Sequence, residues 1–359
     1  MNAQLTITRE HAQRASCVEP LFRARAPLRV SFAGGGTDLA SFFEREGGLV
    51  LSATINRYAH GTLRPRDDQR ISIESLDLDT ALEYHSQDPV QYDGRLDLVK
   101  GAIRRIAQLD EARGVDISLS TAAPPGSGLG ASSALMVSLI GLLRDYHRLS
   151  LSDYDVAHLA WEIERVDLGL SGGLQDQYAA SFGGFNFIEF ERGRVIVNPL
   201  RIPQTTLHEL ESNLLLCFTG ATRAGDRIID DQTRRYESGN EDALAGLRMQ
   251  KELAVAMKNA LLRSRLTEFG ELLGHAWEYK KRISTRISTP VIDEAYAEAI
   301  AQGAIGGKVT GAGGGGFMLF YCRPGSRHRV ARRLTQLGLL ETEFAFTTEG
   351  LTTWSYVER

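Results

Sequence analysis

The chain has 359 residues, of which 43% are hydrophobic, and carries 41 basic against 45 acidic side chains. This length and composition suffice for one large or two ordinary domains with a full core. The net charge of −4 argues against non-specific nucleic-acid binding, which needs a basic surface. The three cysteines lie far apart, so they indicate neither a disulfide framework nor a zinc site, and we expect a reduced, cytoplasmic protein. We expect no membrane association, because the chain lacks a bilayer-length apolar run and an apolar signal segment.

The first part of the chain predicts an extension followed by a strand and a glycine turn. Residues 1–21 are polar and aperiodic, and we interpret them as a loose extension. Apolar and polar side chains then alternate over 28–32, as in a strand, until Gly34–Gly36 interrupt them. Thr37 or Asp38 is placed to cap a short helix that ends at Gly47. Further elements are predicted as strands over 49–63, 71–82 and 115–119, and a helix over 97–113.

A second glycine segment, 123–135, reads APPGSGLGASSAL and leads into an apolar helix that extends to about His147. The two prolines end the preceding strand, and the three glycines allow backbone turns that other residues disfavour. A helix that starts here directs free N–H groups and the positive end of its dipole toward the loop. The segment therefore suits an anion such as phosphate, and the alternative is a tight turn with a serine N-cap.

Two carboxylates follow on predicted helices. Ser152 and Asp155 have the spacing of a capping box for a helix over about 153–168, which carries Glu164 near its end. Asp176 lies on a short helical piece after further glycines, before a strand over 185–190. Taken singly, Glu164 could be a surface carboxylate, Asp176 a helix N-cap and Arg29 a strand-edge charge. A carboxylate with a serine hydroxyl nevertheless suits magnesium, which prefers oxygen ligands.

The character of the sequence changes near residue 200, and we predict domains over 22–200 and 201–359. In the second part we expect helices over 241–262, 266–279, 290–301 and 329–337 and strands over 214–218 and 317–322, while 343–348 and 352–357 could close a sheet. A third glycine segment, 311–316, could be a turn or linker, but close approach of backbone to a ligand explains it better. The fold class is α+β, in two intimately packed halves.

Five basic residues in the second part are expected mainly at the solvated surface, although some could meet an anionic substrate. They are Arg223, Arg227, Lys280, Lys281 and Arg282.

The three glycine segments, in this order, resemble the three motifs of the GHMP kinases. Residues 26–39 read APLRVSFAGGGTDL, against the galactokinase form APGRVNLIGEHTDY. Residues 124–134 match the second motif, with Ala131 where serine is common, and 308–317 match the third. Gly35 and Gly36 replace the Glu-His pair of galactokinases, so the galactose-type contact is absent. The strings SFAGGGTDL and GGLQDQYAA are similar to the branch of heptose 7-phosphate kinases, with L-fucokinase domains as near relatives.

This resemblance implies a fold and an activity. The N-terminal half would be ribosomal S5 domain 2-like, and the C-terminal half an α/β sandwich. The activity would be ATP-dependent phosphorylation of the anomeric hydroxyl of heptose 7-phosphate to the 1,7-bisphosphate, for synthesis of nucleotide-activated heptose. Alternatives are a fucokinase-like enzyme for an unphosphorylated sugar and a catalytically silent sensor of sugar and ATP. A small sugar phosphate is the expected partner, nucleic acid and membranes are not expected, and a homodimer is left open.

The resemblance also implies roles for individual residues. Asp176 would be the catalytic base and Arg29 the basic residue beside it. Ser132 and Glu164 would hold magnesium, although the number of residues from Glu164 to Asp176 in the sequence is about one larger than for its counterpart in mevalonate kinase. The expected contacts to ATP come from Pro125, Gly126, Ser127, Gly128, Leu129, Gly130, Ala131, Ser132 and Ser133. The expected contacts to the substrate come from Gly35, Gly36, Thr37, Asp38, Gly173, Gly311, Gly313, Gly314, Arg223 and Lys281.

Overall fold

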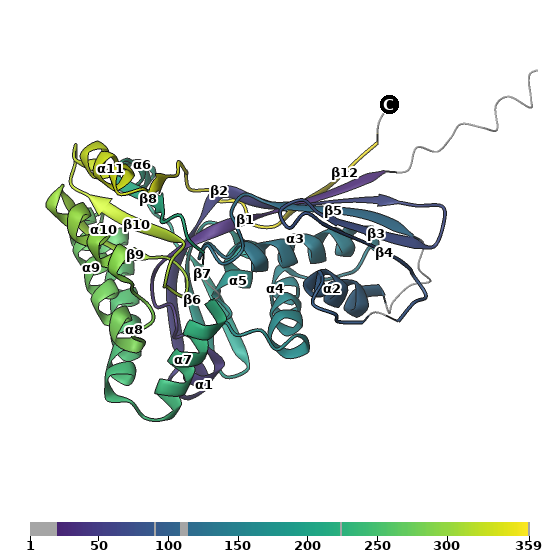
Figure 1. The fold of residues 1–359 in the computed structure, drawn as a ribbon, viewed down its shortest axis with the longest axis horizontal. Coiled ribbons are helices and arrows are strands. Elements are labelled where there is room, and N and C mark those ends of the chain that lie inside the picture. The colour runs from purple at the N-terminus through teal and green to yellow at the C-terminus, as the bar shows by residue number, and fades with distance from the viewer. Residues whose placement is uncertain (1–19, 90, 108–113, 223–224, 358–359) are drawn as a thin grey trace, which may run out of the picture.

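A computed structural model describes residues 20–89, 91–107, 114–222 and 225–357 (Figure 1). The predicted extension at 1–21 therefore lies almost entirely outside the described residues, as does the end of the helix predicted over 97–113. Two sheets with helices packed against them confirm the α+β class. Within the described ranges, no helix combines the length and the apolar character that crossing a membrane requires.

Among the described residues, the larger sheet has eight strands in the order β12-β1-β2-β5-β3-β4, with β6 joined to β2 and β7 to β6. Only the β3–β5 pair of these described strands is parallel. The strands are β1 (Leu21–Ala33), β2 (Gly48–Pro65), β3 (Arg70–Ser75), β4 (Thr80–His85), β5 (Val115–Thr121), β6 (Phe185–Glu191), β7 (Arg194–Pro199) and β12 (Thr352–Tyr356). One face of this sheet is covered by helices α2 (Asp97–Ala107), α3 (Ala131–Tyr146), α4 (Asp153–Trp161) and α5 (Gln175–Phe182) (Figure 1).

The smaller sheet has four strands within the described ranges, in the antiparallel order β11-β8-β10-β9. They are β8 (Leu214–Phe218), β9 (Ala304–Val309), β10 (Phe317–Cys322) and β11 (Leu340–Glu341). The accompanying helices are α6 (Gln204–Asn213), α7 (Gly225–Glu237), α8 (Glu241–Leu262), α9 (Leu266–Ile283), α10 (Pro290–Ala301) and α11 (Arg327–Gln336). A short helix of the first half, α1 (Ala40–Glu46), lies beside α7 (Figure 1).

One apolar core runs through both halves. Leu28 of β1, Leu139 of α3, Met257 of α8, Phe269 of α9 and Leu319 of β10 are fully buried members of the same cluster. Burial of this kind is the main favourable term in folding, so the cluster binds the two halves into one unit. The boundary near residue 200 stays a prediction, but the last strand returns to the first half, because β12 pairs with β1.

Several predicted elements have the limits that the sequence indicates, namely α8, α10, β8 and β10. The capping box is confirmed as well: the Asp155 N–H donates to the Ser152 hydroxyl at 3.2 Å, and the Ser152 N–H donates to the Asp155 carboxylate at 2.8 Å. The helix that it starts changes at Glu162 into one π-helical stretch, η1 (Glu162–Asp167). Wider turns of this kind are often found at functional sites.

Three local predictions are wrong. The strand expected over 71–82 is two strands, β3 and β4, with Asp79 in the turn between them at a φ of 44°. The strand expected over 343–348 is reduced to a single bridge between Phe346 and Ile55. Neither Thr37 nor Asp38 caps α1, whose N-cap is Leu39 without a side-chain bond. The Thr37 hydroxyl instead donates to the Gly34 carbonyl at 2.7 Å.

Candidate active site

The second and third glycine segments meet because their backbones approach more closely than side chains would allow, and strand β1, which leads into the first segment, is joined to the second through Arg29. The Phe317 N–H donates to the Ser127 carbonyl at 3.0 Å, and the Arg29 N–H donates to the Leu129 carbonyl at 3.0 Å. A Cβ on Gly128 would lie 2.5 Å from the Thr310 oxygen, and one on Gly311 would lie 2.6 Å from the Gly128 Cα. The expected close approach at 311–316 is therefore, in part, an approach to the second glycine segment itself.

The start of α3 is open toward a cavity. Gly130 is the N-cap, in the left-handed conformation with a φ of 73°, and no described side chain caps the helix. The alternative of a serine N-cap is therefore wrong. The first N–H groups of the helix and the positive end of its dipole face the glycine segment, which is the arrangement that favours an anion.

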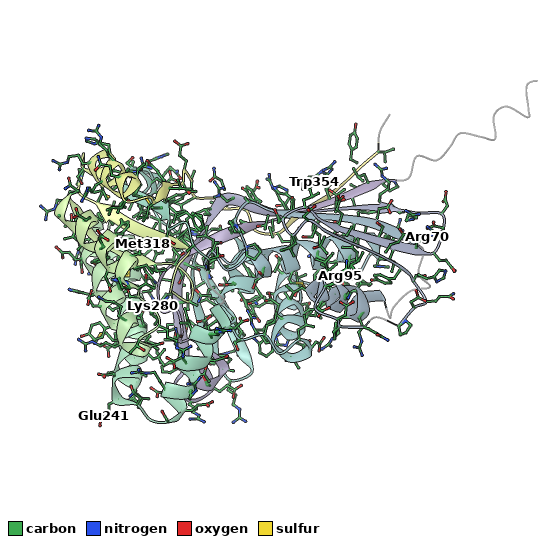
Figure 2. All side chains as sticks on the ribbon, in the orientation of Figure 1. Arg70, Arg95, Glu241, Lys280, Met318 and Trp354 are labelled. Atoms are coloured by element: carbon green, nitrogen blue, oxygen red, sulfur yellow. The ribbon has the colours of Figure 1, made fainter. Side chains whose placement is uncertain are left out.

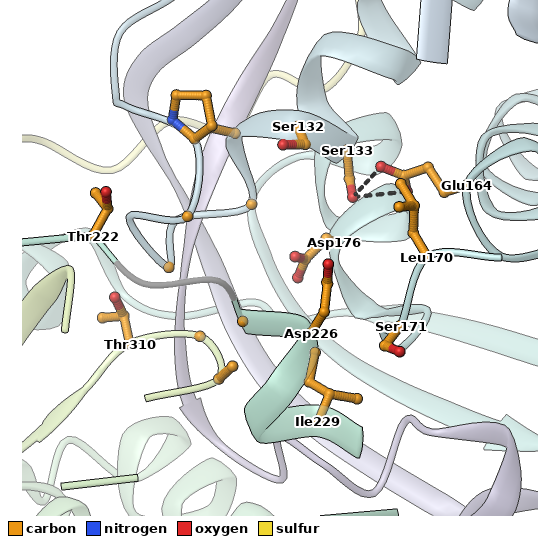
Figure 3. Close-up of a pocket in the computed structure, with 18 of the residues that line it drawn as sticks. Ser132, Ser133, Glu164, Leu170, Ser171, Asp176, Thr222, Asp226, Ile229 and Thr310 are labelled. Carbon is orange, nitrogen blue, oxygen red and sulfur yellow. Dashed lines mark hydrogen bonds between the residues drawn. The ribbon is translucent and has the colours of Figure 1, made fainter. Parts of the chain in front are cut away.

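A cavity of about 460 Å³ lies over this helix end (Figure 3). Among the described residues its wall contains every residue predicted to contact ATP except Ser127 and Leu129. These two are buried behind the wall, and their carbonyls bind the backbones of Phe317 and Arg29. Thr222 and Asp226, beside and within the start of α7, line the opposite side. The contacts to ATP stay a prediction, but most of the predicted residues share one surface.

A smaller cavity of about 90 Å³ adjoins the first. The predicted substrate residues Gly35, Gly36, Asp38, Gly173 and Gly311 line it. The wall that the two cavities share consists of Arg29, Arg165, Ser171, Asp176, Ile229, Gly311 and Ala312.

The other predicted substrate residues are placed differently. In the described structure Thr37 and Gly314 lie outside both cavity walls, and Gly313 lines only the larger cavity. Lys281 is also outside these walls, and its ammonium pairs with Glu278 at 2.9 Å. Arg223 lies outside the described residues.

Arg29 and Asp176 form an ion pair in the shared wall. The Arg29 Nε donates to Asp176 Oδ1 at 2.8 Å, and Nη2 lies 2.6 Å from the same oxygen. Nη1 donates to the Gly128 carbonyl at 2.6 Å, so one guanidinium joins β1, the second glycine segment and α5. The Arg29 side chain is 3% exposed and that of Asp176 is 22% exposed. The carboxylate is therefore oriented from behind and keeps a face toward the cavities.

Asp38 forms the floor of the smaller cavity. Its carboxylate accepts hydrogen bonds from the Gly36 N–H at 2.9 Å and the Gln175 N–H at 3.2 Å. The Gln175 side-chain amide also donates to it, at 3.1 Å. Burial, and secondly the nearby charge of Asp176, raise the pKa of Asp38. Gly173 is required here, because a Cβ at that position would lie 1.9 Å from the carboxylate.

Glu164 lies where the sequence predicts a magnesium ligand, but its direct partner is Ser133 and not Ser132. The Ser133 hydroxyl donates to the two carboxylate oxygens at 3.1 and 2.9 Å (Figure 3). The Gln177 amide also donates to Glu164, and burial raises the pKa of this carboxyl. Glu164 and Ser132 both line the larger cavity, and such oxygen donors beside the predicted phosphate loop fit Mg²⁺. Among the described residues no three His, Cys, Asp or Glu side chains gather for a metal.

The sequence suggested that Lys280 lies mainly at the solvated surface, but its side chain is only 3% exposed and lines the smaller cavity. Figure 2 shows it on α9, on the side toward β1. Its ammonium donates to the Gly311 carbonyl. Burial, and secondly the charge of Arg29, lower the pKa of Lys280 to about 8. Arg227 and Arg282 are exposed, as expected.

Sequence reasoning missed the roles of Arg165, Gln175 and Gln232 in these walls. It also missed Asp226, which Figure 3 shows pointing into the larger cavity toward Asp176. Gln175 precedes Asp176, and Arg165 follows Glu164, so proximity to predicted site residues was the available signal. Gln232 and Asp226 lie on α7, far from every glycine segment in the sequence, and no local pattern indicates them.

Known proteins resemble this chain over nearly its whole length. The GHMP kinase N-terminal domain matches residues 97–184, and the GHMP kinase C-terminal domain matches residues 257–338. A D-glycero-alpha-D-manno-heptose 7-phosphate kinase of Campylobacter jejuni is 41% identical over 335 residues, which cover 92% of this chain and 98% of that protein. An L-fucokinase/L-fucose-1-P guanylyltransferase of Bacteroides fragilis is 28% identical over 87% of this chain and 36% of that protein.

The fold agrees with these matches. The crystal structure of a D-glycero-D-manno-heptose 1-phosphate kinase from Bacteroides thetaiotaomicron has a TM-score of 0.79 and 37% identity to this chain. The likeness covers 93% of this chain and 98% of that one. Because a relative with 41% identity covers 92% of this chain, and both domain models of the family match it, the chain belongs to the GHMP kinase family.

Proposed function

We propose that this protein transfers the γ-phosphate of ATP to the anomeric hydroxyl of D-glycero-D-manno-heptose 7-phosphate, giving the 1,7-bisphosphate. The observation that carries the proposal is that a large and a small cavity meet at the Arg29–Asp176 pair. Donor and acceptor could then occupy one cavity each, with the transfer at their shared wall. The choice of sugar rests on the 41% identity to a heptose 7-phosphate kinase.

GHMP kinases are ATP-dependent, and the larger cavity suits the nucleotide because the glycine segment before α3 lines it. The loop from Pro125 to Gly130 and the open start of α3 would bind its phosphates through backbone N–H groups. Magnesium, when bound, supplies positive charge that offsets the charge developing on the phosphates. Glu164 and Ser132 would hold the ion, and Ser133 and Gln177 would keep the Glu164 carboxylate in place.

Asp176 is the group that would accept the proton of the sugar hydroxyl. Its ion pair with Arg29 fixes the direction of its free face. An anomeric hydroxyl is more acidic than an ordinary alcohol, so a carboxylate is a sufficient base. General-base help of this kind is worth roughly 10²–10⁴ in rate.

The smaller cavity would hold the part of the sugar that carries the reacting hydroxyl. Asp38 is an acceptor for sugar hydroxyls, and the Gln175 side-chain oxygen is buried without a hydrogen-bond partner among the described residues. A hydroxyl of the substrate would satisfy that oxygen, which otherwise costs free energy. The Lys280 ammonium adds a positive charge that suits an anionic acceptor.

A kinase assay with a panel of acceptors tests the proposal. ADP release is measured with heptose 7-phosphate, heptose 1-phosphate, free heptose and L-fucose, and NMR of the product identifies the phosphorylated carbon. We expect the highest kcat/KM for heptose 7-phosphate and a new phosphate on the anomeric carbon. A preference for fucose would favour the fucokinase alternative, which the 28% identity to a fucokinase supports. Nucleotide binding with no turnover of any sugar would favour a sensor.

A further inference from the structure

Arg165 lies in the wall that the two cavities share. It belongs to η1, directly after Glu164, and its side chain is 16% exposed. Two cations and one carboxylate, Arg29, Arg165 and Asp176, are the charged members of this shared wall as the described residues form it. All three side chains line both cavities.

Arg165 has weak contacts within the protein. Its Nη1 donates to the Leu170 carbonyl at 3.5 Å, and its Nη2 lies 3.6 Å from the Glu164 carboxylate. Its Nε is buried and has no hydrogen-bond partner in the described part of the chain. Leaving a buried donor of a charged group unpaired is costly, so the guanidinium is well suited to an additional anionic partner.

Arg29 has closer partners within the protein than Arg165 has. Arg29 is engaged by Asp176 and by the Gly128 carbonyl at hydrogen-bond distances of 2.6–2.8 Å. The Glu164 carboxylate, the nearest anion to Arg165, already accepts hydrogen bonds from Ser133 and Gln177. Arg165 is therefore the cation of the shared wall whose charge is least used inside the protein.

The backbone at Gly172 leaves space for this guanidinium. A Cβ on Gly172 would lie 2.3 Å from the Arg165 Cζ and 2.4 Å from its Nη2. The next residue, Gly173, leaves equivalent space for Asp38 on the other side. The two glycines thus allow one short segment to pass between a cation of the shared wall and a carboxylate of the smaller cavity.

We infer that Arg165 binds the γ-phosphoryl group of ATP at the shared wall and stabilises it during transfer. This inference rests on the proposed phosphotransferase function. The phosphoryl group carries its charge on three oxygens that lie around the line of transfer, and the protein contributes mainly position and positive charge. A planar guanidinium can bind two such oxygens at once. Arg29 would then serve mainly Asp176, and Arg165 the phosphoryl group.

Variants of Arg165 separate this role from binding of the remote phosphate of the sugar. Arg165→Gln removes the positive charge, and Arg165→Lys keeps the charge without the planar guanidinium. Gly172→Ala leaves Arg165 in the chain but pushes its guanidinium out of its present position. For Arg165→Gln we expect kcat to fall about 100-fold or more, by analogy with arginines that contact transferring phosphoryl groups. Arg165→Lys should keep part of that activity, and Gly172→Ala should resemble Arg165→Gln.

Nucleotide titrations provide a readout that needs no sugar. Binding of the non-hydrolysable analogue AMP-PNP should weaken in Arg165→Gln, whereas binding of ADP, which lacks the γ-phosphate, should not. This result would stand even if the acceptor were a different sugar, so it is independent of the substrate assignment. Arg105→Gln is the matched control, since Arg105 pairs with Asp167 at 2.7 Å outside both cavities of the described structure.

Two results would overturn the inference. One is equal binding of AMP-PNP by Arg165→Gln and the unchanged protein together with an unchanged kcat. The other is a rise in KM for the phosphorylated sugar alone, with kcat and KM for ATP retained, which would assign Arg165 to the remote phosphate. Thermal denaturation of each variant shows whether it is folded, and Arg165→Lys provides a reading if Arg165→Gln is not.

Discussion

Asp176→Asn examines the centre of the proposed site with little change in shape. The amide has the size of the carboxylate and can still present one oxygen to Arg29. The substitution removes the negative charge that two nitrogens of Arg29 contact at 2.8 and 2.6 Å. Arg29 keeps its bond to the Gly128 carbonyl, so the loop should remain joined to β1. The main loss is therefore the proton acceptor.

The expected magnitude follows from the position of the pair. Loss of a general base costs about 10²–10⁴ in rate, which corresponds to about 2.7–5.5 kcal/mol in activation free energy. Breaking a fully buried ion pair costs about 3–5 kcal/mol in stability. Asp176 is 22% exposed, and the amide oxygen retains one contact, so we expect a smaller cost of about 1–3 kcal/mol.

The assay is steady-state ADP release with heptose 7-phosphate, together with AMP-PNP titration and thermal denaturation. We expect kcat to fall at least about 100-fold while nucleotide affinity is retained. Asp167→Asn is the control, because it removes a carboxylate bound to Arg105 at 2.7 Å outside both cavities of the described chain. Near-normal kcat in a folded Asp176→Asn protein would refute its role as the base.

Three further predictions concern the loops and the charge of the smaller cavity. Gly128→Ala should destabilise the fold by about 1–3 kcal/mol and weaken ATP binding, because φ is +85° and the new Cβ would meet the Thr310 oxygen. Gly239→Ala is the control, because Gly239 has a φ of +74° in open space and its substitution tests the backbone strain without the steric clash. Equal denaturation midpoints for the two variants would contradict the steric argument. Ser132→Ala should raise the magnesium concentration needed for half-maximal rate, and an unchanged titration would exclude Ser132 as a ligand. KM for the sugar phosphate should rise as the pH passes about 8, where Lys280 loses its proton. Lys280→Met should remove this rise in KM, and a rise that persists in the variant would show that another group causes it.

Loss of the Lys280 proton should weaken substrate binding but stabilise the fold. The folded pKa of Lys280 lies below its ordinary value of 10.5, so the unfolded chain binds this proton more tightly. Stability should therefore increase as the pH rises from about 8 toward 10.5, provided that other groups do not dominate. Chemical denaturation of Lys280→Met across this range should lack that contribution, and an identical pH dependence in both proteins would contradict it.

The sequence by itself determined many of the local elements and the residues that belong to short motifs. Helix α8 and strand β10 have the predicted limits, and the capping box at Ser152 is present, because periodicity and caps act over a few residues. The resemblance to GHMP kinases indicated Asp176 and Arg29 as partners, and the structure pairs them. It also indicated the loop that we propose to bind phosphate, and most of its residues line one cavity.

Tertiary structure alone decided which distant groups face each other. Lys280 reads as one of several basic residues at the end of a helix, yet packing of α9 buries it beside Gly311. Thr37 suits a helix cap, but the turn at Gly34 takes its hydroxyl instead. Arg165 becomes distinctive only because Gly172 leaves it space at the wall between two cavities. Such outcomes depend on contacts between residues far apart in the chain, which no local pattern of side chains encodes.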